Sequence, residues 1–147
     1  MPRRRKAREC ALQLLFQWEG DRPDPASLLP AFWQSRKVDH ETLRFAEELF
    51  LGTVGALDEI DPLLAAHSQH WKLERMAAVD RNLLRLAVGE LMAHPQTPPA
   101  VVIDEALEIG RRFSSEDSVE FINGVLDAIR KALESRAPAG AKKPAGG

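Results

Sequence analysis

The chain has 147 residues, of which 44% are hydrophobic and 29% are charged, a balance typical of one soluble globular domain that can bury a core. Its single cysteine, Cys10, excludes an intrachain disulfide and a thiolate metal cluster. No apolar run of signal-peptide or membrane-spanning length is present, so we expect a cytoplasmic protein.

The charged residues are unevenly distributed, although the net charge is only −2. Of the 20 basic residues, five form a basic arm near the N-terminus and two lie at positions 142 and 143. The other 13 share positions 9–136 with all 22 acidic residues, a net charge of about −9. The arm suits an anion such as nucleic acid, whereas the acidic body would attract a basic protein. The alternative is an arm that is merely solvated. The arm consists of Arg3, Arg4, Arg5, Lys6 and Arg8.

Helical periodicity predicts a first helix that begins near residues 3–5 and ends by Gly20. Leu12 and Phe16 lie roughly opposite its core stripe, on the side of Glu9. This second apolar patch requires a second contact, either with a partner or with another part of the chain. The core stripe consists of Ala7, Cys10, Ala11, Leu14, Leu15 and Trp18.

Aspartate and proline positions predict three further helices in the next part of the chain. A short helix over residues 25–33 is expected to bend at Pro30. Asp39 is placed to cap a third helix, which Asp61-Pro62 interrupts, and a fourth helix then ends near His67. The inward face of the third is predicted at Leu43, Ala46, Phe50, Val54 and Leu57.

The second half of the chain predicts three more helices. Residues 73–92 are apolar on most sides, which is typical of a central helix. Prolines 98 and 99 open the next helix, and Ser114, with Asp117 three residues later, starts the last one. Their inward residues are expected to be Val102, Ala106, Ile109 and Phe113, then Ile122, Leu126, Ile129 and Leu133.

The sequence therefore predicts an all-α fold of about seven helices joined by short loops, as one bundle or a pair of small bundles. Residues 137–147 are rich in Ala, Gly, Pro and Lys without apolar periodicity, and predict a disordered tail after a domain at 1–136.

Motifs for catalysis are lacking in the sequence. There is no glycine-rich phosphate loop or dinucleotide fingerprint, and Cys10 lies inside the core stripe without a nearby histidine. His67 and His70 lack the spacing and the glutamate of a helical zinc site. We therefore expect a binding protein rather than an enzyme, with no metal and no cofactor.

The segment at residues 117–125 is unusual because an Asn-Gly pair lies within an unbroken helical seam. Phe121 lies one position off that seam, four residues after Asp117. An exposed aromatic ring flanked by hydrogen-bonding side chains suits single-stranded RNA, because a base can stack on it. A phenylalanine of the core is the alternative.

Four stretches of the chain carry a further pattern: an arginine-rich helix at 4–18, the segments 79–87 and 90–91, Pro99 with 102–106, and 116–118 with 121–127. In this order, they resemble the NusB family of transcription antitermination factors. The likeness extends from about Arg3 to Leu133. Phe16 and Gly89 stand where tyrosine is common in that family.

This resemblance implies two packed three-helix bundles and a heterodimer with NusE, a protein of the small ribosomal subunit. It further implies binding to single-stranded boxA RNA in nascent ribosomal RNA transcripts, within an antitermination complex on RNA polymerase. The implied partner-binding residues are Phe16, Glu74 and Asp80, and the Leu12 and Phe16 patch would gain a partner. The implied RNA-binding residues are Arg3, Arg4, Arg5, Lys6, Arg8, Gln13, Asp117, Phe121 and Asn123.

Two other functions are compatible with the resemblance. One is the NusB-like RNA-binding domain of an RNA cytosine methyltransferase, which we disfavour because no room remains for a cofactor-binding domain. The other is a homodimer that buries Leu12 and Phe16 on itself. The sequence leaves open whether four further arginines extend the RNA surface or pair with local acids: Arg81, Arg85, Arg111 and Arg112.

Overall fold

The computed structural model describes residues 2–68 and 72–146, with side chains for 3–68 and 72–136. All regular structure within these ranges is helical, which confirms the all-α prediction. No helix in the described ranges combines the length and apolar character needed to cross a membrane. The elements are α1 (Pro2–Asp21), η1 (Pro25–Leu28), α2 (Leu29–Gln34), α3 (His40–Gly55), α4 (Leu57–His67), η2 (Leu73–Arg75), α5 (Ala78–Ala93), α6 (Pro99–Phe113) and α7 (Glu116–Gly146).

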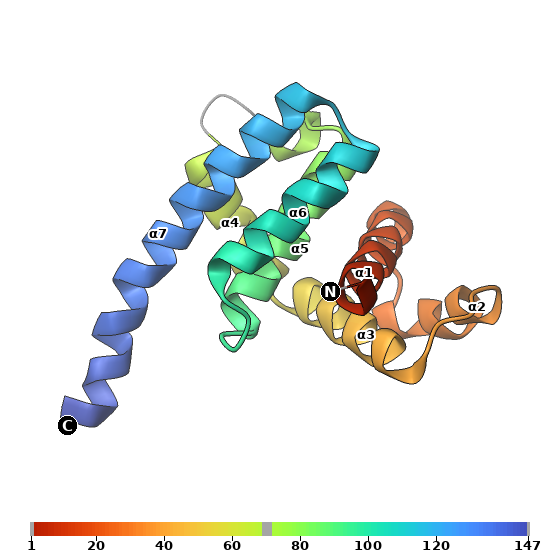
Figure 1. Ribbon diagram of the computed structural model, residues 1–147, viewed down its shortest axis with the longest axis horizontal. Helices are drawn as coiled ribbons and strands as arrows, with labels where there is room; N and C mark the ends of the chain where they lie inside the picture. Colours follow the sequence, from red (N-terminus) through yellow and green to blue (C-terminus); the bar gives the residue numbers. More distant parts are fainter. Residues whose placement is uncertain (1, 69–71, 147) are drawn as a thin grey trace.

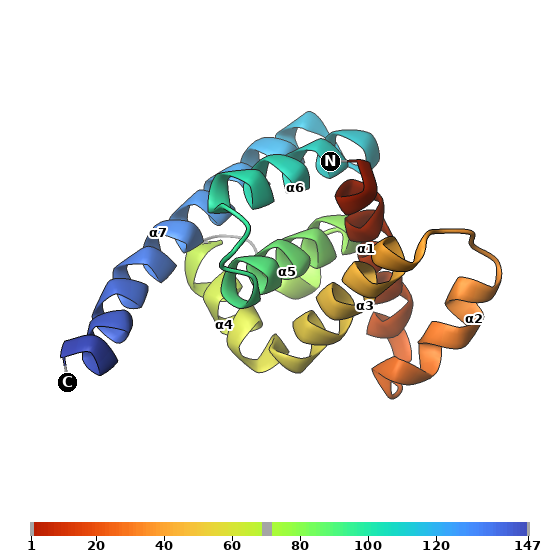
Figure 2. The ribbon, with the colours of Figure 1, turned by 60° about the horizontal axis from the view of Figure 1, so that its bottom comes forward.

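Helix α5 occupies the centre of the molecule and joins two bundles (Figures 1 and 2). On one side it packs against α1 and α3, which also pack against each other. On the other side it packs against α6 and α7, and α4 lies against both α5 and α7. The predicted pair of packed three-helix bundles is confirmed, and its central helix is the one whose sequence is apolar on most sides.

The core stripe predicted for α1 is buried in full, from Ala7 to Trp18. Fully burying one large aliphatic side chain contributes about 1.5–3 kcal/mol, so this seam anchors α1 to the rest of the fold. The capping prediction for α3 is also confirmed, since the Asp39 side chain accepts a hydrogen bond from the Thr42 backbone N–H at 2.7 Å. The predicted bend at Pro30 lies where η1 changes to α2.

The predicted helix break at Asp61-Pro62 is wrong. Helix α3 ends at Gly55, and α4 begins two residues later and includes Pro62. A proline inside a helix costs about 3 kcal/mol, because it removes one backbone hydrogen bond and crowds the preceding turn. The burial of Leu57, Ile60 and Leu64 on the inner face of α4 offsets that cost.

The buried face of α3 is shifted from the prediction, because Leu43 and Val54 are only half-buried. Thr53 is buried on this face, where α3 passes close to α5. A Cβ atom added to Gly89 of α5 would lie 2.6 Å from the Thr53 Oγ1 atom, which is too close for any side chain. Glycine at this position therefore permits the approach of the two helices. The buried residues of α3 are Thr42, Phe45, Ala46, Leu49, Phe50 and Thr53.

The junction between α6 and α7 differs from the prediction at two positions. Phe113, expected to point inward, is 46% exposed at the end of α6. The residue that caps α7 is Ser115 rather than Ser114, since its hydroxyl accepts from the Ser118 backbone N–H at 3.1 Å. The Asn-Gly pair at 123–124 lies within α7, where a helical seam continues through a dipeptide more typical of turns.

Helix α7 continues as backbone through residues 137–146, where the sequence predicts a disordered tail, and extends beyond the body of the molecule (Figure 1). The side chains of this stretch lie outside the described residues. The division of the chain at residue 136 therefore stays a prediction.

Candidate nucleic-acid interface

The basic arm forms the first turns of α1, where its side chains face α3 and α6 as well as solvent. Arg3 is exposed and pairs with Asp39 and Glu41, at nitrogen–oxygen distances of 3.2 and 3.3 Å. The guanidinium of Arg4 lies over the Phe45 ring, 3.9 Å from its centroid. Lys6 is exposed. Such exposed contacts contribute little, so these cations can exchange them for phosphate.

Arg5 is held more firmly than its neighbours. Its Nε and Nη2 atoms donate to the two carboxylate oxygens of Glu105 on α6, at 2.9 and 2.8 Å. These hydrogen bonds lower the pKa of Glu105 and raise the pKa of Arg5. The Arg5 side chain is still 39% exposed, so one edge of the guanidinium stays accessible to an anion.

The structure contradicts the prediction that Arg8 contacts RNA. Its side chain is 6% exposed, and its Nε and Nη2 atoms donate to both oxygens of Glu90 on α5, at 2.8 and 2.6 Å. Glu90 is itself buried, so the pair forms a bidentate ion pair inside the protein. Arg8 therefore holds α1 against α5 and has no surface to offer a phosphate.

A second group of predicted RNA-binding residues lies on the first half of α7. Asp117 and Asn123 are exposed, whereas Phe121 is half-buried against the core. Phe121 and Asp117 line a cavity of about 350 Å³ together with Arg75, which sequence reasoning did not single out. Arg75 is exposed and makes no ion pair among the described residues. The other lining residues are Met76, Ala77, Asp80 and Ser118.

Asp80, which the resemblance assigns to the partner surface, is 8% exposed at the start of α5. Its Oδ1 atom accepts a hydrogen bond from the Ser114 hydroxyl at 2.5 Å, and its Oδ2 atom accepts one from the Ser118 hydroxyl at 2.8 Å. Neither serine was recognised as its partner from the sequence, because both are more than 30 residues away. The assignment of Asp80 to the partner surface stays a prediction, and both of its carboxylate oxygens already accept hydrogen bonds within the chain.

An apolar groove of about 300 Å³ lies between α1, the start of α5 and the end of α6. Phe16 and Phe113 are 57% and 46% exposed in it, whereas Leu12 is 7% exposed and forms part of its lining. Of the predicted patch, Leu12 thus packs internally and Phe16 stays available. Glu74, the remaining predicted partner residue, is exposed on η2. The other groove residues are Glu9, Gln13, Gln17, Arg36, Ala78 and Val79.

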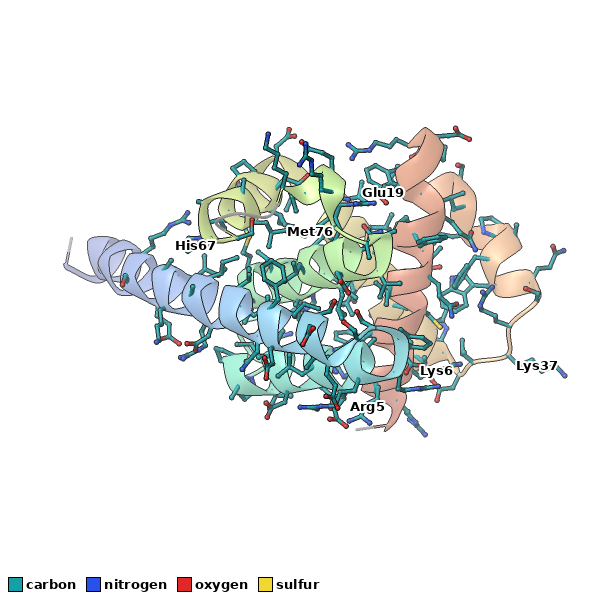
Figure 3. The ribbon with its side chains drawn as sticks, turned by 90° about the horizontal axis from the view of Figure 1, so that it is seen from above. Arg5, Lys6, Glu19, Lys37, His67 and Met76 are labelled. Carbon is teal, nitrogen blue, oxygen red and sulfur yellow. The ribbon has the colours of Figure 1, made fainter. Side chains whose placement is uncertain are left out.

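The four arginines left open by the sequence all pair with acids. Arg81 and Arg85 both donate to Glu19 at the other end of α1 from the arm (Figure 3), and Arg85 also donates to Asp61. Hydrogen bonds from Arg81, with weaker contributions from Arg85, lower the pKa of Glu19 from 4.5 to about 2. Arg111 pairs with Glu108, and Arg112 pairs with Glu9 but stays 61% exposed.

The two groups of RNA candidates lie near opposite ends of α5. The arm contacts Glu90, while the α7 cavity is built around Asp80, ten residues or about 15 Å earlier along the helix. Exposed Lys6, Gln13 and Phe16 lie along α1 between them, at helical spacing. The histidine pair is not informative, because His70 lies outside the described residues, and those described contain no group of three or more potential metal ligands.

Residues 5–131 match the family model described as "NusB family". The chain belongs to the NusB family. Two relatives named transcription antitermination protein NusB support this at high similarity. The protein of Koribacter versatilis is 50% identical over 133 residues, covering 90% of this chain and 91% of that protein. The protein of Solibacter usitatus is 47% identical over 141 residues, covering 94% of this chain and 96% of that protein.

Solved NusB structures share the fold. A structure of T. maritima NusB is 37% identical with a TM-score of 0.78, covering 87% of this chain and 90% of that one. A crystal structure of the antitermination factors NusB and NusE in complex with double-stranded RNA is 28% identical with a TM-score of 0.81, covering 90% and 98%. Because the NusB relatives match over nearly their whole length, the methyltransferase alternative is not favoured.

Proposed function

We propose that this chain is a transcription antitermination factor that binds boxA-type RNA in nascent ribosomal RNA transcripts together with NusE. In this role it joins the antitermination complex on RNA polymerase, in the cytoplasm, and has no catalytic activity. The observation that carries the proposal is the run of exposed residues along α1, from the cations of the arm to the apolar groove. The names of its close relatives and the related NusB–NusE–RNA complex support the same function.

The arm supplies electrostatic attraction to the RNA backbone. With Arg8 in the core, four cations remain for phosphates: Arg3, Arg4, Arg5 and Lys6. Four contacts with single-stranded RNA predict a slope of log affinity against log salt of about −2.8, rather than about −3.5 for five. Electrostatic binding of this kind is independent of sequence.

Base recognition is assigned to Gln13 and to the α7 surface with Asp117, Phe121 and Asn123. The exposed part of the Phe121 ring offers a stacking platform, which is typically worth about 1–3 kcal/mol per base. Asp117 is exposed one turn before Phe121 on the same side of α7 and can read base edges, whereas Asn123 is exposed on another side of the helix. Arg75, at the rim of the same cavity, adds a cation for the phosphate of the stacked nucleotide.

The partner is proposed to occupy the apolar groove. Exposed aromatic residues such as Phe16 and Phe113 are typical anchors of a protein interface. The acidic body of the chain favours a basic partner, and Glu74 is exposed to receive it, whereas the Glu9 carboxylate in the groove is already paired with Arg112. A partner there would lie next to the α7 surface and could extend the RNA contact area.

Fluorescence anisotropy of labelled RNA tests the proposal directly. BoxA RNA and a scrambled control are titrated as single strands and as duplexes, with and without NusE, at two salt concentrations. We expect selective binding to single-stranded boxA that tightens when NusE is added. Equal, weak binding to all RNAs that NusE does not change would overturn it. Preference for the duplex would instead reassign the RNA form, in line with the double-stranded RNA of the related complex.

A homodimer is the competing occupant of the groove, because Phe16 and Phe113 are exposed in the single chain. Sedimentation of the free protein at increasing concentration separates the two states. A dimer that dissociates when NusE is added would mean that both use the same surface.

A further inference from the structure

The α6–α7 junction is fastened to α5 by one carboxylate. Asp80, in the first turn of α5, accepts hydrogen bonds from Ser114, which directly follows α6, and from Ser118, in the first turn of α7. We call these three residues the serine clamp. Because both oxygens of Asp80 are engaged, the end of one helix and the beginning of the next are held to the same point.

The surroundings of Asp80 favour this arrangement over a partner contact. The carboxylate is largely buried, and no basic side chain of the described residues pairs with it. Its charge is stabilised by the free N–H groups of the first turn of α5 and by the two hydroxyl donors. A carboxylate whose two oxygens both accept hydrogen bonds within the chain is tied to these helices before any other protein binds.

The clamp lies within the proposed RNA surface. Asp117 precedes Ser118 by one residue, and Phe121 follows it by three, or just under one helical turn. Asp80, Ser118, Asp117 and Phe121 line the same cavity. The turn that the clamp holds therefore carries the carboxylate assigned to base recognition and directly precedes the ring.

The same part of α5 also contributes to the apolar groove. Ala78 and Val79, directly before Asp80, line the groove, whereas Met76 and Ala77 line the α7 cavity. The partner surface and the base-recognition surface thus share the short segment 76–80. The clamp joins this segment to α7 through the hydrogen bond between Asp80 and Ser118.

We propose that Asp80 is a positioning residue that fixes the first turn of α7 for RNA selection, through Ser114 and Ser118, and is not a partner contact. This inference rests on the proposed function of the chain. A rigid first turn presents Phe121 and Asp117 in one orientation, so less ordering is required when the base binds. Without the clamp, the cations of the arm still attract RNA, but the α7 surface no longer selects it.

The test compares Asp80→Ala, Ser118→Ala and the double variant for affinity to boxA and scrambled RNA. We expect each variant to lose about tenfold in boxA affinity, with scrambled RNA within about twofold and the salt slope unchanged. The double variant should be no weaker than Asp80→Ala alone, because both changes break one interaction. Asp80→Asn, whose amide can accept from one serine and donate to the other, should recover boxA affinity to within about threefold of wild type.

Two controls separate positioning from general destabilisation. Ser135→Ala removes an exposed hydroxyl of α7 far along the helix, and Ile129→Val weakens the α7 core away from the clamp. Both should keep the selectivity of the wild type. Amide hydrogen exchange of residues 116–121 should accelerate in Asp80→Ala but not in either control, and this readout does not depend on RNA.

The outcomes distinguish the inference from the proposed function. If the wild type does not select boxA, the proposed function fails, while the exchange experiment still decides whether the clamp holds α7. If the wild type selects boxA and the clamp variants do so equally, the inference is overturned. It is also overturned if Asp80→Ala weakens NusE binding while Ser118→Ala does not, because Asp80 would then be a direct partner contact.

Discussion

The two ends of α5 hold their neighbours with carboxylates in different ways. Near the C-terminal end, Glu90 binds Arg8 of the arm in a buried ion pair, next to arm cations that stay exposed. Near the N-terminal end, Asp80 binds two neutral serine hydroxyls beside an aromatic ring and an apolar groove. The first end thus offers exposed positive charge, and the second offers shape and hydrogen bonds. We infer that affinity and selectivity for RNA are separated along α5 by about 15 Å.

The largest expected effect is a loss of stability when the ion pair between Arg8 and Glu90 is removed at the arm end of α5. Arg8→Ala should destabilise the protein by about 3–5 kcal/mol, because it leaves the buried Glu90 carboxylate without its cation. Urea denaturation measures the loss. Arg4→Ala, which removes an exposed arm cation, is the matched control and should cost under about 1 kcal/mol. A fully stable Arg8→Ala variant with weakened RNA binding would restore Arg8 to the RNA surface.

The next effect concerns a third carboxylate, that of Glu19, which binds Arg81 and Arg85 at the end of α1 away from the arm. The pKa of Glu19 is lowered from 4.5 to about 2, so its contribution to stability is complete above pH 4.5 and is lost as the pH falls towards 2. Stability should fall by about 2–3 kcal/mol over this range through Glu19 alone. Denaturation at several pH values measures it for wild type and Glu19→Gln. The two curves should converge at acid pH, and parallel curves would contradict the assignment.

A third prediction sharpens the role of the groove. Phe16→Asp should weaken NusE binding by about 2 kcal/mol, or roughly thirtyfold, because it places a charge where an aromatic anchor is expected. Leu51→Asp is the control, since Leu51 is also an exposed apolar residue but lies on α3, outside the groove. Isothermal titration calorimetry with NusE compares the variants. Equal losses in both variants would mean that the groove is not the interface.

The smallest effect concerns a single exposed charge of the arm. Lys6→Ala should make the salt slope of RNA binding shallower by about 0.7, the contribution of one phosphate contact, for boxA and scrambled RNA alike. Lys37→Ala, an exposed lysine that lies away from α1 in Figure 3, should leave the slope unchanged. An unchanged slope in Lys6→Ala would exclude this residue from the RNA path.

The helices could largely be predicted from sequence because apolar spacing and caps are local signals. The α1 stripe and the Asp39 cap follow from residues within one or two turns. Pro62 was misleading because its cost is local, whereas the burial that offsets it depends on contacts of α4 with distant helices.

The candidate site was less predictable because it depends on tertiary contacts. Arg8 shares its residue type with the exposed arm, and only its helical phase, three residues before Ala11 and seven before Leu15, indicates that it faces the core. Asp80 gave no such signal, since its serines lie 34 and 38 residues away. The exposure of Phe113 likewise depends on how α6 ends beside α1.

The separation of affinity from selectivity is tested most directly by anisotropy titrations of boxA and scrambled RNA with wild type, Lys6→Ala and Phe121→Ala, at two salt concentrations. We expect Phe121→Ala to lose about 1–3 kcal/mol of boxA binding with scrambled RNA and the salt slope unchanged. Lys6→Ala should weaken the binding of both RNAs in the same proportion and make the salt slope shallower. Two results would contradict the account: an equal loss of affinity for both RNAs in Phe121→Ala, or a changed ratio of boxA to scrambled affinity in Lys6→Ala. Affinity and selectivity would then not be separated between the two ends of α5.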